Sequence, residues 1–229
     1  MTKTDRAISA LARVETLLGL RRNEEAGRVA SQVITGDPHN GRAWLLRAQA
    51  LLGQGKHEKA LAAARAASSV EPGAEFSHRV ASIALSHLGR RQESAEEAQL
   101  AVELAPDNWA THYLHGQTLL DLQFLDEAQA TAERAVALAP DRAEAHLGLG
   151  TVAAAQGRRD AAENSFRRAL AINPQYAAAQ SRLAALGTGL RRTRGMSDPS
   201  LDRVPAHAKT TTPRSRFGSG LRARARAAS

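Results

Sequence analysis

Small apolar residues recur along the chain with a period of 34 residues, in step with five prolines at the same spacing. These prolines are Pro38, Pro72, Pro106, Pro140 and Pro174. The spacing divides most of the chain into five repeats, and the proline occupies place 32 of the 34 in each. The repeats are 7–40, 41–74, 75–108, 109–142 and 143–176. Such repetition is typical of an array in which one supersecondary unit is stacked on copies of itself.

Three places in each repeat hold small side chains, as the close approach of two helices requires. Thirteen of the fifteen residues at places 8, 20 and 27 are Gly, Ala or Ser, and both exceptions, Val14 and Val33, lie in the first repeat. Place 15 is Gly55, Gly89 or Gly157 in three repeats, which is typical of the end of a helix. Acidic residues follow, where they favour the start of a second helix, and the proline then stops that helix. Each repeat is therefore predicted to hold a first helix over places 1–14 and a second over places 18–31.

This pattern resembles the tetratricopeptide repeat, whose motif of Trp-x2-Leu-Gly-x2-Tyr, Ala-x3-Phe and Pro spans 34 residues. The matching residues are Trp44, Ala60 and Pro72 in repeat 2, and Leu149, Gly150, Ala162, Phe166 and Pro174 in repeat 5. The resemblance implies an all-α, right-handed superhelical solenoid of five helix-turn-helix repeats. This chain departs from the motif by alanine at place 24 in repeats 1 to 4 and by histidine at place 4 in repeats 3 to 5. These departures predict a thinly packed, alanine-rich array.

The segments outside the repeats differ from them in pattern and in charge. Residues 1–6 form a short lead, and residues 177–186 are predicted to be one more amphipathic helix that caps the last apolar face. From 187 to 229 the helical periodicity is lost, and this tail is predicted to be disordered. Residues 1–186 carry no net charge, so the whole excess of +8 lies in the tail. Its clustered arginines, candidate anion-binding residues, are Arg191, Arg192, Arg194, Arg214, Arg216, Arg222, Arg224 and Arg226.

The resemblance also implies a binding surface, because the first helices of such repeats line a concave groove with places 2, 5, 9, 12 and 13. Apolar side chains there would attract a peptide or an amphipathic helix, arginines would hold a carboxylate, and amides would pair with a peptide backbone. The predicted groove residues are Arg42, Leu45, Gln49, Phe76, Arg79, Ile83, Tyr113, Gln117 and Leu147. The alternative is that these side chains pack against the neighbouring first helices or meet the capping helix. Some family members clamp the acidic ends of heat-shock chaperones with basic and polar residues of their first helices. The residues at the matching places of this chain do not fit that role, and Glu15 would repel a carboxylate.

No catalytic, cofactor or metal site is predicted. The chain has no cysteine, and no glycine-rich phosphate loop follows a strand. His78, His112 and His146 recur every 34 residues, but neighbouring helices lie roughly 10 Å apart, which is too far for a shared metal. Each histidine is therefore expected to replace the family's tryptophan in packing.

A non-catalytic protein–protein interaction scaffold is the function that these features favour. Two alternatives remain: the tail binds nucleic acid or an anionic surface, or the chain targets a larger transferase system, because similar arrays precede some bacterial transferases. The tail could equally be an unselected extension. No apolar run reaches the roughly 18 residues that span a bilayer, and no signal peptide is recognised, so a cytoplasmic protein is expected. The partner's identity and the oligomeric state stay open.

Overall fold

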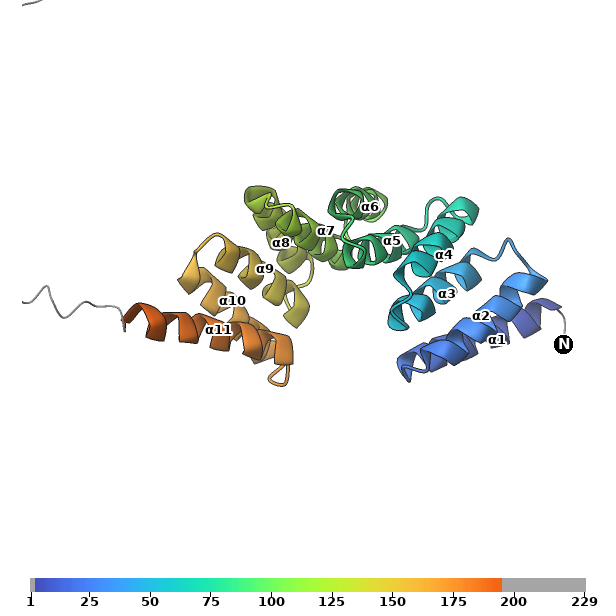
Figure 1. Ribbon diagram of the computed structural model, residues 1–229, viewed down its shortest axis with the longest axis horizontal. Helices are drawn as coiled ribbons and strands as arrows, with labels where there is room; N and C mark the ends of the chain where they lie inside the picture. The colour runs from blue at the N-terminus through green and yellow to red at the C-terminus, as the bar shows by residue number, and fades with distance from the viewer. Residues whose placement is uncertain (1–2, 195–229) are drawn as a thin grey trace, which may run out of the picture. The chain divides into compact units, whose positions relative to one another are not determined.

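Helices account for the described part of the chain, residues 3–194 of a computed structural model, and no strand occurs in that range (Figure 1). The odd-numbered helices are α1 (Lys3–Gly19), α3 (Gly41–Gly53), α5 (Glu75–His87), α7 (Trp109–Asp121), α9 (Ala143–Ala155) and α11 (Ala177–Arg194). The even-numbered helices are α2 (Asn23–Gly36), α4 (His57–Val70), α6 (Arg91–Leu104), α8 (Leu125–Leu138) and α10 (Arg159–Ile172). From α2 onward, each helix begins 34 residues before the next helix of its set. The predicted fold class, an all-α solenoid of five helix-turn-helix repeats and a further helix, is confirmed.

Residues up to Leu190 form one compact unit, in which the helices lie in two layers. From α1 to α10, each helix packs against the next one in the chain. The odd-numbered helices from α1 to α9 also contact one another in sequence, whereas the even-numbered helices of the described residues do not. The odd-numbered helices therefore form the crowded inner layer and the even-numbered helices the outer layer, which makes the surface of the inner layer the concave one.

The turn between the two helices of each repeat adopts the same backbone conformation in all five. Place 15 has a positive φ throughout, between 56° at Arg21 and 74° at Gly89 and Gly157. In repeat 2 the N–H of Lys56 donates to the carbonyl of Leu51 and that of Gly55 to Leu52, each at 2.9 Å, and the other repeats form the equivalent bonds. These two bonds define a Schellman turn, which satisfies the last carbonyls of the first helix. Only glycine adopts this conformation without strain, so the backbone is strained at the two remaining positions, Arg21 and Gln123.

The end of each second helix is set by the proline at place 32. The residue before it leaves the helical conformation in every repeat, with φ between −130° and −149° and ψ between 71° and 95°. The proline ring causes this, because its Cδ clashes with a helical residue in front of it. The N–H of this residue still donates to the carbonyl at place 27, so the last turn is closed before the chain leaves the helix.

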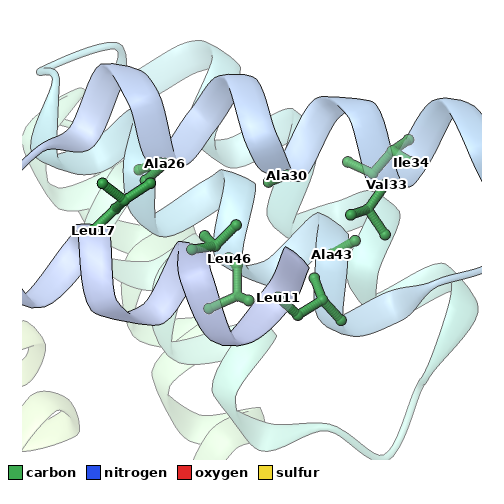
Figure 2. Close-up of a cluster of buried hydrophobic side chains, with 10 residues drawn as sticks. Leu11, Leu17, Ala26, Ala30, Val33, Ile34, Ala43 and Leu46 are labelled. Carbon is green, nitrogen blue, oxygen red and sulfur yellow. The ribbon is translucent and has the colours of Figure 1, made fainter. Parts of the chain in front are cut away.

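Alanine fills most of the contact between the two helices of a repeat, as predicted. At place 24, Ala30, Ala64, Ala98 and Ala132 are at most 4% exposed. Larger side chains supply the apolar volume in the first repeat, where α1, α2 and the start of α3 share one cluster (Figure 2). Its labelled members are Leu11, Leu17, Ala26, Ala30, Val33, Ile34, Ala43 and Leu46.

Helix α11 covers the last repeat, but it is longer than predicted. Ala179 is fully buried, and Leu183 and Leu186 pack against the cluster that contains Phe166. The helix was predicted to end at residue 186, and it continues to Arg194. Glycine in a helix interior costs only about 1 kcal/mol relative to alanine, so the glycine at 187 weakens the helix without ending it. The predicted disorder of the tail from residue 195 lies outside the described residues.

Substitution of glycine by alanine at place 8 should have opposite effects in repeats 4 and 5. A Cβ on Gly150 would lie 2.6 Å from the ring of the buried Phe166, whereas one on Gly116 would lie 3.5 Å or more from its neighbours on α8. We expect Gly150→Ala to lower the free energy of unfolding by about 1–3 kcal/mol, because the core is overpacked. Gly116→Ala should raise it by up to about 1 kcal/mol through helix propensity. Urea unfolding monitored by circular dichroism measures both, and equal effects would contradict this packing.

The two strained turns should gain stability from glycine. Gln123→Gly and Arg21→Gly remove the left-handed strain, so each should raise the free energy of unfolding by about 0.5–1 kcal/mol. Gly89→Ala is the matched control and should lower it by about 1 kcal/mol. A loss of stability in both glycine variants would show that place 15 is relaxed with a side chain.

Candidate functional site

The predicted groove residues lie on the inner helices, where they differ in exposure. Arg42 and Gln117 are exposed. Half-buried side chains make up most of the set: Leu45, Gln49, Phe76, Arg79, Ile83 and Tyr113. A half-buried apolar side chain on a concave surface is already held in place and still offers one side to a partner.

Leu147 is the exception, because it is buried and fits the alternative that a predicted groove residue packs against the capping helix. It is only 8% exposed and belongs to the core cluster of the last repeat with Phe166 and Ala179. Helix α11 contributes Ala179 to this cluster, so the capping helix occupies the space that a following repeat would take. Place 5 is therefore a packing position at this end of the array.

Arg79 and Phe76 form the polar and aromatic centre of the inner surface. The Arg79 guanidinium carbon lies 4.7 Å from the centre of the Phe76 ring, and its Nη1 lies 4.0 Å from the Glu75 carboxylate. That carboxylate accepts a 3.3 Å hydrogen bond from the amide of Asn108. Arg79 Nε is buried and has no hydrogen-bond partner among the described residues. Burial lowers the pKa of Arg79 from its ordinary value, and the Glu75 carboxylate opposes this shift. The Arg79 cation is thus only weakly neutralised by Glu75, and its partly exposed guanidinium could meet an anionic group.

Arg42 is engaged differently, although it was predicted to have the same role. Its guanidinium donates to the carboxylate of Glu15 on the neighbouring helix α1. Both side chains are exposed, so this ion pair contributes little stability. A ligand carboxylate would have to compete with Glu15 for Arg42, which makes Arg79 the better-placed cation.

Tyr113 anchors the other side of this region. Its ring packs over Gly148 of α9, where a Cβ would lie 3.0 Å from the ring, and it leans on Trp109 with ring centres 6.2 Å apart. Burial raises the pKa of Tyr113, and a hydrogen bond with the exposed Gln117 opposes that shift. The close packing of α7 on α9 thus depends on the glycine at 148.

The inner layer is loosest between α5 and α7. Of the neighbouring inner pairs from α1 to α9, these two helices make the fewest contacts. Phe76, Arg79 and Ile83 lie on α5, and Tyr113 and Gln117 lie on α7. The predicted groove residues that combine aromatic, cationic and amide groups therefore flank the inner pair of helices with the fewest contacts. Sequence reasoning missed Glu75 and Asn108, whose pairing depends on a contact between repeats.

The recurring histidines at place 4 form hydrogen bonds within the fold. The Nε2–H groups of His112 and His146 donate to the carbonyls of Pro106 and Pro140, at 2.7 and 3.0 Å. The indole of Trp44 makes the same bond to the carbonyl six residues before it, and so does the amide of Gln180. His78 instead pairs with Glu97 at 2.8 Å. The residues that the structure describes contain no group of three or more His, Cys, Asp or Glu side chains placed to hold a metal ion.

The predicted anion-binding arginines of the tail give no site geometry. The backbone of Arg191, Arg192 and Arg194 lies in the last turns of α11, and their side chains lie outside the described residues. Arg214, Arg216, Arg222, Arg224 and Arg226 lie outside the described residues entirely. Over the part of the chain that is described, no helix is long and apolar enough to cross a membrane.

Comparisons with known proteins agree on the fold. A family model described as tetratricopeptide repeat matches residues 11–74 and 113–186. The thermophilic protein TTC0263 of Thermus thermophilus is 21% identical with a TM-score of 0.71, over 80% of this chain and 99% of its own. MamA of Desulfovibrio magneticus RS-1 is 17% identical with a TM-score of 0.62, over 76% of this chain and 98% of its own.

A third solved structure, YrrB, is described as a repeat protein of this type with an unusual peptide-binding site. It is 18% identical with a TM-score of 0.58, over 78% of this chain and 92% of its own. Identities this low show a shared fold alone. No curated protein sequence matches the chain.

Alkaline pH should destabilise the fold through Tyr113. Its pKa is raised in the folded state, so above about pH 10 the unfolded chain releases this proton while the folded chain retains it, and stability falls as the pH rises. Tyr113→Phe should make this fall shallower than in the unchanged protein. Urea unfolding at neutral and alkaline pH tests the difference, and an unchanged fall would show that Tyr113 ionises freely. Tyr176→Phe should also make the fall shallower, since burial raises the pKa of this tyrosine too.

Proposed function

The chain belongs to the tetratricopeptide repeat family, and from that premise we propose that its inner helices bind a peptide or a helical segment of a partner protein. A scaffold fold of this family is consistent with protein–protein interaction, and family members are generally non-catalytic. The observation that carries the proposal is the pair of Phe76 and Arg79 beside the loosest inner junction. An aromatic ring and a half-buried arginine are the side chains that dominate binding energy at protein interfaces.

The chemistry of this surface supports a segment that has both an apolar and an acidic side chain. Phe76 and Ile83 offer apolar contact, and the accessible part of the half-buried Arg79 guanidinium would bind a carboxylate. The exposed amide of Gln117 supplies a donor and an acceptor for a backbone. YrrB, which shares the fold, is described as having a peptide-binding site, so the fold is compatible with this role.

Phe76→Ala should weaken partner binding strongly. Affinity capture from a native lysate with the full chain would first identify a partner, and titration of that partner would then give the dissociation constant. Loss of a central aromatic side chain should raise this constant about tenfold or more. Arg79→Gln should raise the dissociation constant by a similar factor. The increase should be larger for a partner with its acidic side chain than for a partner variant without it.

Phe124→Ala is the matched control, because Phe124 is 49% exposed at the start of α8 and is not on the inner surface. It should leave the dissociation constant unchanged. Thermal unfolding of each variant would separate lost binding from lost folding. A partner that binds Phe76→Ala and Arg79→Gln as well as the unchanged chain would refute the groove.

A second function is favoured by charge alone. The excess of +8 lies in residues 187–229, and arginine-rich segments bind polyanions through release of counterions. If capture is abolished by nuclease or by moderate salt, and is indifferent to Phe76→Ala, the basic tail rather than the inner surface carries the binding.

A further inference from the structure

An apolar pocket of about 500 Å³ opens between α1 and α2 in the first repeat, apart from the Phe76 and Arg79 pair described above. Its walls are formed by Ala7, Ala10, Leu11, Val29, Val33 and Gly36. Charged and polar groups, including Arg6 and Asp37, stand at its rim. This volume is within the range of sites that bind ligands or large side chains.

The pocket exists because the first repeat lacks two large side chains. Place 4 is Ala10, where the later repeats have Trp44, His78, His112 and His146. Place 30 is Gly36, where the later repeats have Val70, Leu104, Leu138 and Ile172. Both small residues line the pocket, one from each helix. Repeat 1 therefore has small residues at two positions of this pocket where the other repeats have larger ones.

A large apolar side chain stands at the mouth of this pocket. Ile8 lines it and is 63% exposed, one of the two most exposed large apolar side chains of the described residues. The other is Leu20, also 63% exposed, which lies beyond the opposite end of α1. An apolar pocket and an exposed isoleucine thus lie side by side on one face, so the same face can both give and accept an apolar side chain.

We propose that this face of repeat 1 binds a second copy of the chain, with Ile8 of each copy inserted in the pocket of the other. A two-fold contact of this kind requires a surface that is complementary to itself, and pocket and isoleucine on one face meet that requirement. The charges at the rim meet it too. Arg6 and Asp37 are both exposed and form no ion pair within the described residues, so Arg6 of one copy can pair with Asp37 of the other. This inference is independent of the groove proposed above.

Sedimentation equilibrium of the full chain tests the proposal. We expect a concentration-dependent mass that rises from 24.4 kDa toward twice that value. Ile8→Lys should raise the dimer dissociation constant at least about tenfold, because it places a charge in an apolar pocket. Leu20→Lys, the equally exposed control, should leave the constant unchanged. A chain that is monomeric at all concentrations would overturn the proposal, and so would a dimer that Ile8→Lys does not weaken.

Filling the pocket from within gives a second test that does not alter Ile8. Ala10→Trp and Gly36→Leu restore side chains that later repeats carry at the same places, Trp44 and Leu104. Both variants should fold, as circular dichroism would verify, and both should weaken the dimer at least about tenfold. A folded variant with a filled pocket and unchanged dimerisation would place the interface elsewhere.

Charge reversal tests the two-fold arrangement itself. Arg6→Glu and Asp37→Lys each put like charges opposite one another, so each variant alone should dimerise less tightly than the unchanged chain. An equimolar mixture of the two would restore both attractive pairs and should form a mixed dimer. If the mixture dimerises no better than either variant alone, Arg6 and Asp37 do not face each other across the interface.

Discussion

The contact between the two helices of each repeat depends on side chains that are too small to hold the helices apart. The residues at place 8 (Val14, Ala48, Ser82, Gly116 and Gly150) are all buried, and alanine or serine opposes them at place 20 in every repeat. Close approach brings backbone against backbone, so dispersion and good packing replace the large apolar volumes of an ordinary core. The close approach of the two helices fixes the distance that the short turn between them must span. It also leaves the inner faces of the first helices free to contact neighbouring repeats or a partner.

Much of the fold could be predicted because the repeat itself carries the information. The 34-residue spacing of the prolines locates every second helix, and the non-helical residue before each proline follows from the proline ring. The left-handed turn was less visible, because only three of its five positions are glycine. Arg21 and Gln123 adopt the left-handed conformation because they occupy the turn position of the repeat, although residues with a side chain disfavour it. The length of α11 was underestimated because glycine weakens a helix more readily than it stops one.

The candidate site was harder to predict than the fold, because exposure depends on what lies across the next helix. Leu147 occupies the same place as Leu45 and Arg79, yet α11 covers its surroundings. The hydrogen bond from Asn108 to Glu75 joins residues 33 positions apart, and no sequence motif predicts it. The pocket of the first repeat, by contrast, follows from the register: Ala10 and Gly36 are small where the other repeats have larger residues. Comparison of each place across repeats is thus more informative than the residue alone.

Each repeat of an array of this kind contacts only the repeats next to it, so small changes at one junction add up along the array. A few degrees of rotation at one junction carry every later repeat with it, without breaking a contact elsewhere. The two helices α5 and α7 make the fewest contacts of the inner layer up to α9, so we expect the array to bend first at this junction. The groups with the most varied chemistry flank that same joint, so a bound segment that drew α5 and α7 together would also change the pitch between the repeats on either side.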